Sequence, residues 1–491
     1  MPRNFLAAVV SKRRGLLASW CTADHPSDVP LGSSLARKKL ENTDRLSMLT
    51  DDILLSILER LDITTAARTS ILSTRWRHLP WLLRELTIDV KDFLSVPRPN
   101  PIEVEHMDAA MASLSKAIRS FMATKWSEAP ITKLQLKLYL QLRRCHCPLV
   151  RQAIDSGGAK DLDLAIVDEK EPDDCYEEEM LQQARSVDGY LIVQWDMQHL
   201  LFDCCKQLQH LSLNNCDSGG PSAWKIHAPD SKLSFIELRF CLLGKLEVLF
   251  LPKLENLNWN IWMCPGTPLS FDVVPFFKEL NLLCAATVSH RGFNLSEVLR
   301  HTTALQNLTL NFQGEKLWLK PEGKELCTAF SKLRKLSLQG IFIEFDLLWA
   351  IVLLEAAPSV EIFDIEIWEH PYIVDSEDRS KTFGERTNPS WRVAEFRNQK
   401  EWLLKEVEVT GFSPMEQQIT FLRAVIERAS NLQTVVLKDH QPCTYCEERG
   451  ALPRPERLPA ERLFPKGKDE QDRTVEQLTR DISDRNLKMN E

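Results

Sequence analysis

The amino-acid sequence predicts a mixed α/β protein with a small helical unit near its N-terminus, a long stack of short parallel strands, and a terminal β-α-β unit. Two periodic patterns in the 491 residues lead to this prediction. Apolar residues at positions 49–61 recur three or four apart, which places them on one face of a helix. From Ile131 onward, an apolar residue is followed three and five positions later by two more, and this spacing returns along the chain. Because successive residues of a strand point to opposite sides, each copy predicts a short strand with one buried face.

The helical unit spans residues 43–83 and contains three predicted helices. Thr50 can cap the first helix, and the carboxylates that follow it favour the positive end of the helix dipole. The second helix is expected at residues 65–72, and the third carries Trp76 and ends at Pro80. Three short helices cannot bury all of their apolar surface, so part of that surface is expected to face a partner.

The same residues resemble the F-box of plant F-box proteins. The matching segments are Asp44-Arg45-Leu46-Ser47 and Arg68-Thr69-Ser70-Ile71-Leu72-Ser73-Thr74-Arg75-Trp76-Arg77. The family has a proline where this chain has Thr50, which implies a weaker adaptor contact at that position. The resemblance implies binding to a Skp-type adaptor, and through it to a cullin, by the residues Leu49, Thr50, Ile53, Leu54, Ile57, Leu58, Leu61, Leu72 and Trp76. A helical hairpin without a partner is the alternative interpretation.

The strand pattern fills the region that we assign to residues 84–399. Its copies, and two that follow them, are Ile131-Leu134-Leu136, Leu208-Leu211-Leu213, Leu233-Ile236-Leu238, Leu254-Leu257-Trp259, Phe277-Leu280-Leu282, Leu305-Leu308-Leu310, Leu333-Leu336-Leu338, Val360-Phe363-Ile365, Leu404-Val407-Val409 and Leu432-Val435-Leu437. The starts from Leu208 to Val360 are 21 to 28 residues apart, which is close to the period of leucine-rich repeats. One copy alone would also fit an amphipathic helix, but the series predicts an irregular leucine-rich-repeat solenoid with helical returns at residues 295–299 and 345–354.

Residues 400–446 predict the terminal β-α-β unit. A strand ends near Phe412, a helix follows at residues 415–429, and a second strand occupies residues 431–437. This segment resembles the FBD domain, so the order of parts resembles that of the plant F-box/FBD/LRR-repeat protein family. As a final β-α unit, it is expected to cap the solenoid.

Charged segments are expected to lie outside the core. Residues 1–42 are basic and are predicted to be a disordered extension, with a targeting signal as the alternative. The acidic residues 168–179 are predicted to form a solvated loop, with a docking surface for a basic partner as the alternative. The tail at residues 447–491 is predicted to be disordered, apart from a loose helix at residues 472–487.

Composition and motifs argue against several classes of protein. The net charge of −8 argues against a nucleic-acid binder, and no apolar run approaches the ~20 residues that span a membrane. The 13 cysteines are scattered, which fits free thiols in a reducing compartment. Candidate zinc ligands are Cys145-His146-Cys147, which are too close together, and His440, Cys443 and Cys446, which lack a second pair. We therefore expect no metal and no cofactor, and the chain carries no known catalytic motif.

These parts predict a substrate-recognition subunit of an SCF-type (cullin-RING) E3 ubiquitin ligase. In this prediction the F-box binds the adaptor, the solenoid binds a protein substrate, and the chain itself is not an enzyme. An F-box/LRR scaffold or receptor that works outside any ligase is the alternative. The expected location is the nucleus, the cytoplasm or both.

Overall fold

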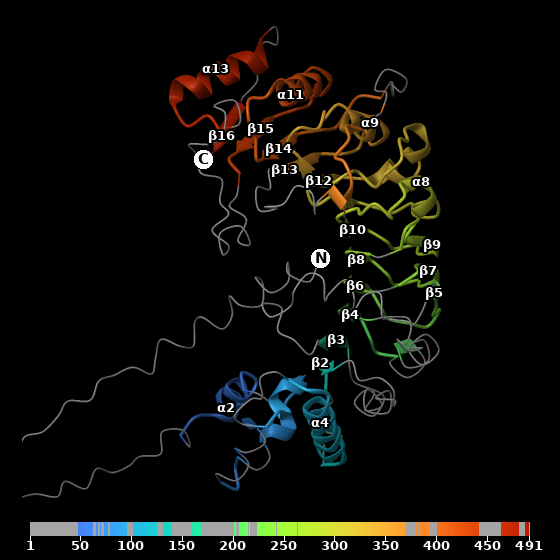
Figure 1. Ribbon diagram of the computed structural model, residues 1–491, viewed down its shortest axis with the longest axis vertical. Helices are drawn as coiled ribbons and strands as arrows, with labels where there is room; N and C mark the ends of the chain where they lie inside the picture. The colour runs from blue at the N-terminus through green and yellow to red at the C-terminus, as the bar shows by residue number, and fades with distance from the viewer. Residues whose placement is uncertain are drawn as a thin grey trace, which may run out of the picture. The chain divides into compact units, whose positions relative to one another are not determined.

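The computed structural model describes residues 48–61, 65–66, 69, 73–76, 79–95, 102–124, 131–139, 160–167, 201–202, 206–214, 216, 223–241, 243–262, 264–368, 380–381, 383–389, 391, 400–440, 463–480 and 487–490. They belong to two compact units: the described residues up to Tyr139 form the first unit, and those from Lys160 onward form the second. Each unit is described by itself (Figure 1).

The first unit combines short helices with one pair of strands. Its elements are α2 (Asp51–Leu58), the 3-10 helix η3 (Leu79–Leu82), β1 (Glu85–Asp89), the 3-10 helix η4 (Val90–Phe93), α4 (Val104–Thr124) and β2 (Lys133–Tyr139). Strand β1 pairs in parallel with β2, and Leu86 lies opposite Leu134. Helix α4 connects them and buries Met107, Met111 and Leu114, which recur at helical spacing.

Two details of the first unit differ from the sequence prediction. Leu83, Leu86 and Ile88 follow the repeat spacing and are buried, so the strand pattern begins at β1 rather than at Ile131. The expected third helix, beginning at Ser73, is not observed in the described residues: residues 73–76 form a loop and turn, and the 3-10 helix η3 begins at Leu79 with Pro80 as its second residue. A proline is tolerated in a first helical turn, where its missing N–H would have no intrahelical partner. The expected helix at residues 65–72 lies mostly outside the described residues.

The second unit is built on a ladder of parallel strands, each paired with the next. In order, the strands are β3 (Asp161–Val167), β4 (His210–Asn214), β6 (Phe235–Arg239), β8 (Asn256–Asn260), β10 (Glu279–Leu283), β11 (Asn307–Asn311), β12 (Lys335–Phe342), β13 (Ile362–Trp368), β14 (Glu406–Thr410), β15 (Thr434–Lys438) and β16 (Leu487–Asn490). The predicted repeat residues form continuous buried rows in this ladder, for example Leu257, Leu280, Leu308 and Leu336. Stacked apolar rows of this kind are the core of a leucine-rich-repeat solenoid.

The segments that connect successive ladder strands differ in secondary structure along the second unit. In the earlier repeats they are strands, β5 (Ala223–His227), β7 (Lys245–Phe250) and β9 (Leu269–Val273), which form a second parallel ladder. In the later repeats they are helices: α8 (Leu295–Val298), η7 (Lys324–Leu326), η8 (Ala329–Lys332), α9 (Trp349–Ala356) and α11 (Glu416–Arg428). Figure 1 shows β5, β7 and β9, and farther along α8, on the same side of the main ladder. The helices near residues 295 and 349 were predicted, whereas the second ladder was not.

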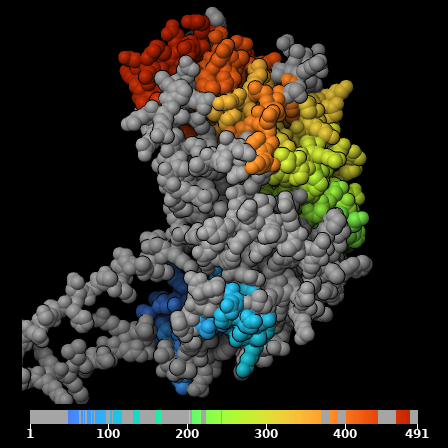
Figure 2. Space-filling model, in the orientation of Figure 1, coloured from blue at the N-terminus to red at the C-terminus, as the bar shows by residue number. Residues whose placement is uncertain are grey.

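The described residues of the tail, 463–480 and 487–490, contain a helix and a strand, where only a loose helix at residues 472–487 was expected. Helix α13 (Lys468–Thr479) packs on α11, and β16 extends the ladder beyond β15. Figure 2 shows the red surface of α13 adjoining the orange surface of α11. Phe464, Thr474 and Leu478 are buried although charged residues surround them in the sequence. A terminal repeat with a polar outer face is what a solenoid needs at its end.

Candidate functional site

The helices of the first unit bury six side chains in a small core: Leu54, Leu58, Ala66, Trp76, Leu79 and Leu83. Leu54 and Leu58 are four residues apart in α2, on one face of the helix, and both have an exposed fraction of 0%. Three of the predicted adaptor residues, Leu54, Leu58 and Trp76, therefore stabilise the unit itself. A partner cannot contact them unless this core opens.

Other predicted adaptor residues remain accessible in the first unit. Ile53 is 48% exposed and Leu61 is 38% exposed, while Leu49 and Ile57 are partly buried against the core. Leu72 lies outside the described residues. The structure adds two exposed apolar side chains that sequence reasoning did not include, Met48 and Leu82. Helical periodicity could not identify them, because both lie outside α2.

Thr50 occupies the N-cap of α2, as predicted, but its side chain makes no capping hydrogen bond. Its carbonyl oxygen accepts from the N–H of Leu54 at 3.1 Å. Arg75 instead holds this end of the helix, because its Nε donates to Asp51 Oδ1 at 2.7 Å and its Nη2 donates to the Leu49 carbonyl at 2.6 Å. Both partners of the ion pair are substantially exposed, so the contribution to stability is of the order of 0.2–1 kcal/mol.

The outward side of the main ladder in the second unit carries polar rows. Asn258, Asn281 and Thr309 lie opposite one another on β8, β10 and β11. Two positions along the same strands, Asn260, Leu283 and Asn311 form the next row. These positions alternate with the buried leucines, so the apolar rows face the core and the amide rows face away from it.

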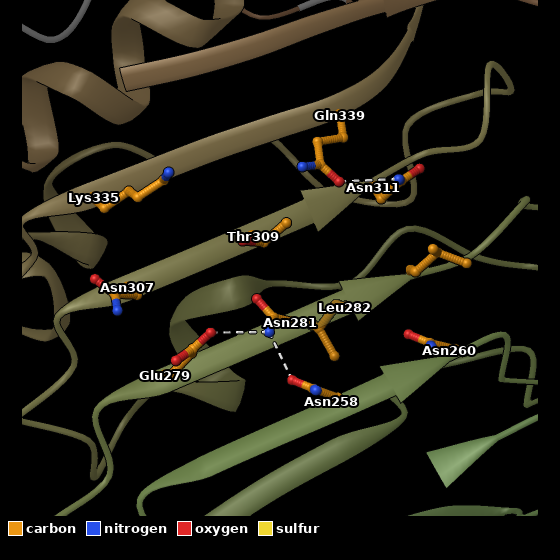
Figure 3. A pocket seen from close by; sticks show the side chains of 11 residues that line it. Asn258, Asn260, Glu279, Asn281, Leu282, Asn307, Thr309, Asn311, Lys335 and Gln339 are labelled. Carbon is orange, nitrogen blue, oxygen red and sulfur yellow. Dashed lines mark hydrogen bonds between the residues drawn. The ribbon is translucent and has the colours of Figure 1, made fainter. Parts of the chain in front are cut away.

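A pocket of about 450 Å³ lies over these rows, and we call it the amide pocket (Figure 3). Its lining residues are Asn258, Asn260, Glu279, Asn281, Leu282, Leu283, Asn307, Thr309, Asn311, Lys335 and Gln339. Parallel pairing in register is what brings these side chains together from segments that are more than twenty residues apart in the sequence. No local motif marks them, which is why the sequence analysis missed them.

Hydrogen bonds order part of the amide pocket. Asn281 Nδ2 donates to Asn258 Oδ1 at 2.6 Å and to Glu279 Oε1 at 3.2 Å. Glu279 also accepts from Asn256 Nδ2 at 3.2 Å. Lys335 lies 2.6 Å from Asp364, so its charge is neutralised on the side away from Glu279. Such an arrangement is suited to binding a polar ligand, because it offers preorganised donors and acceptors.

One close cysteine–histidine pair was not singled out from the sequence. Cys284 Sγ lies 3.8 Å from His290 Nε2, and such pairs serve nucleophilic enzymes when the thiolate is accessible. Here Cys284 is fully buried, and burial raises the pKa of its thiol, which disfavours the thiolate. His290 Nε2 lies 3.2 Å from the carbonyl of Trp262, and Nδ1 accepts from the N–H of Thr287 at 3.1 Å. Burial lowers the pKa of His290, so a neutral ring holds this turn together.

The described residues contain neither a cluster of metal ligands nor a helix suited to span a membrane. No group of three or more His, Cys, Asp or Glu side chains in them could hold a metal ion. Of the candidate zinc ligands, His440 belongs to this part of the chain, whereas Cys443, Cys446 and residues 145–147 lie outside it. Within the ranges that the structure covers, every helix is too short or too polar to cross a membrane.

Comparisons with known proteins decide the family. The model of the family described as "At1g61320/AtMIF1, LRR domain" matches residues 187–456, which is more than half of the chain. The chain belongs to this leucine-rich-repeat family. The F-box domain model matches residues 46–80, so the chain combines an F-box with leucine-rich repeats, and an F-box/LRR protein of this kind is typically a non-catalytic adaptor.

Relatives of this F-box/LRR chain occur in Arabidopsis thaliana. It is 48% identical over 66 residues to "Putative F-box protein At2g39415", which covers 13% of this chain and 52% of the relative. It is 43% identical over 53 residues to "F-box protein At1g80960", covering 11% of each. It is 26% identical over 205 residues to "F-box/LRR-repeat protein At5g02910", covering 41% of this chain and 40% of the relative. The chain thus spans about half or less of the length of these relatives.

The matched leucine-rich-repeat region includes residues 400–446, where the sequence resembles an FBD domain. The structure has the expected order of strand, helix and strand there, in β14, α11 and β15. Because β14 pairs with β13 and β15 pairs with β14, this segment continues the ladder. The assignment to the FBD family stays a prediction.

Proposed function

We propose that this protein is the substrate-recognition subunit of an SCF-type cullin-RING ubiquitin ligase. The observation that carries the proposal is the joining, in one chain, of an F-box match to a leucine-rich-repeat domain. The F-box would bind a Skp-type adaptor, and the ladder would hold a protein substrate. Catalysis would then come from proximity, because the chain would bring substrate lysines close to a charged ubiquitin carrier.

The described surface of the first unit supports adaptor binding. Six of its side chains form a buried cluster, whereas Met48, Ile53, Leu61 and Leu82 remain exposed. Burial of exposed apolar side chains is the main favourable term in association, and a fully buried isoleucine contributes about 1.5–3 kcal/mol. We therefore assign adaptor contacts to these exposed residues and a structural role to Leu54, Leu58 and Trp76.

The test is co-purification of the full-length chain with a recombinant Skp-type adaptor. Ile53→Glu should weaken binding at least tenfold, because a carboxylate would be buried against an apolar partner. Ser56→Glu is the matched control, since Ser56 is also exposed on α2 and receives the same charge. Both variants should retain the melting temperature of the wild type.

Equal adaptor binding by the two variants would refute the assignment of this surface. Leu54→Ala gives an internal comparison, because it should lose stability as well as binding. A wild-type chain that binds no adaptor at all would refute the proposed function itself.

A second candidate is an F-box/LRR scaffold or receptor that works outside any ligase. The observation in its favour is Thr50, which stands where the resembling family has proline and is exposed at the end of α2. Co-precipitation of a cullin from cells distinguishes the two candidates, because only a ligase subunit should recover one. A fluorescent fusion would test the proposed nuclear or cytoplasmic location in the same cells.

A further inference from the structure

The amide pocket offers polar groups that the protein does not use itself. Among the described residues, the Asn281 side chain makes two hydrogen bonds, and Nδ2 donates both. The Asn281 Oδ1 is therefore available to a ligand. No hydrogen bond to another described residue occupies the side chains of Asn260, Asn307 or Thr309. Each carboxamide can donate and accept, and this dual capacity matches the alternating N–H and C=O groups of a peptide backbone.

The pocket also carries one carboxylate without a cationic partner among the described residues. Among these residues Glu279 accepts only from the neutral amides of Asn256 and Asn281. Lys335 is the cation of the pocket lining, and it pairs with Asp364 at 2.6 Å. Lys335 lies on β12, two strands from β10, at a spacing of roughly 9–10 Å. The pocket is therefore complementary to a cationic group placed beside Glu279.

The geometry of the rows favours an extended occupant. Asn258, Asn281 and Thr309 cross three adjacent strands in register, which spans roughly 10 Å. An extended peptide covers that distance with about three residues. The volume of about 450 Å³ is that of a site for a few residues rather than for a folded surface.

We propose that the amide pocket binds an extended peptide segment that carries a lysine or arginine side chain. The basic side chain pairs with Glu279, and the amide rows hydrogen-bond the backbone of the segment. Charge-assisted hydrogen bonds of this kind are roughly twice as strong as neutral ones. The proposal rests on the proposed function, because the segment would belong to the protein substrate that the ligase subunit recognises.

The probe is a set of blocked nonapeptides of alanine and threonine with Lys, Arg, Gln or Glu at the central position. Binding to the full-length chain is measured by fluorescence anisotropy at physiological salt. The Lys and Arg peptides should bind about tenfold more tightly than the Gln peptide, and the Glu peptide should bind most weakly. Glu279→Gln should abolish this preference, and Glu279→Lys should reverse it in favour of the Glu peptide.

Glu406→Gln is the matched control. Glu406 lies on the same outward side and in the same register row as Glu279, and it has no cationic partner among the described residues. It is four strands away, roughly 19 Å, which exceeds the screening length of about 8 Å. The control should change the affinity less than twofold.

Three outcomes would overturn the proposal: equal binding of all four peptides, equal losses in Glu279→Gln and Glu406→Gln, or no binding of any peptide at millimolar concentration. Adaptor co-purification is measured on the same preparations. If adaptor binding persists while peptide selectivity is absent, the pocket assignment fails and the ligase function stands. If adaptor binding is absent, the proposed function fails independently of the pocket.

Discussion

Replacing Leu478 with alanine is expected to destabilise the C-terminal end of the ladder. Leu478 lies on α13, has an exposed fraction of 0%, and belongs to a helix that packs on α11. The carbonyl of Arg480, just beyond this helix, accepts from Arg423 Nη2 of α11 at 3.3 Å. Buried leucine-to-alanine changes cost about 2–5 kcal/mol, because transfer energy is lost and a cavity remains.

The size of the effect is judged against Leu463→Ala in the same segment. Leu463 is 38% exposed, so its truncation removes less buried area than that of Leu478 and should cost about 1 kcal/mol. The two variants remove the same atoms from the same part of the chain. The difference between their losses of unfolding free energy therefore measures how much the burial of Leu478 in α13 stabilises the chain.

Urea unfolding and hydrogen exchange provide the assay. Because each repeat contacts only its neighbours, Leu478→Ala should lower local stability most near the end of the ladder. Amides of α11 and β15 should exchange faster in Leu478→Ala, whereas those of β8 and β10 should not. Equal stability of Leu478→Ala and Leu463→Ala would show that α13 is not integral to the solenoid.

Three further predictions concern the backbone and one thiol. Gly411→Ala should cost about 1–3 kcal/mol in urea unfolding, because Gly411 has φ +75° and a Cβ there would overlap the carbonyl oxygen of Ile367. Gly266→Ala is the control, since a Cβ there would meet nothing within 4 Å, and it should change stability by about 0.5 kcal/mol or less. Similar losses in the two variants would contradict a role for strain at Gly411. Thr50→Pro should raise the unfolding free energy of the first unit by about 0.4–1 kcal/mol, because the Thr50 φ of −70° suits proline and the Thr50 side chain makes no capping hydrogen bond. The same variant should tighten adaptor binding in a titration by about 1 kcal/mol. Weaker binding would show that threonine is adequate at this position. Burial raises the pKa of the Cys264 thiol from 9.0 to about 11, so its contribution to stability is intact below pH 9 and is lost as the pH rises to 11. The stability difference between wild type and Cys264→Ala should thus shrink by about 3 kcal/mol over that interval in urea unfolding, and parallel pH profiles would exclude this linkage.

The repeat architecture was predictable because its signal is local. Leu280 and Leu282, like their counterparts in the other repeats, point to the buried face of their strand whichever strands pair with it. Their spacing alone therefore predicts both the strand and the burial. The helix at Asp51–Leu58 follows from the same reasoning, with alternation replaced by helical periodicity. Strand β1 follows the same pattern and was recoverable from Leu86 and Ile88.

The sequence by itself thus determined the class of the protein, its F-box and the apolar spacing of its ladder strands. Only the tertiary structure decided which apolar side chains of α2 are core, because Ile53 and Leu54 are adjacent and equally apolar, yet one is 48% exposed and the other is 0% exposed. It also decided that residues 463–480 of the charged tail fold, since α13, which carries the buried Leu478, packs on α11. The amide pocket likewise exists because parallel pairing aligns Asn258, Asn281 and Thr309. Burial and pocket formation depend on neighbours distant in the chain, and local spacing carries no information about those neighbours.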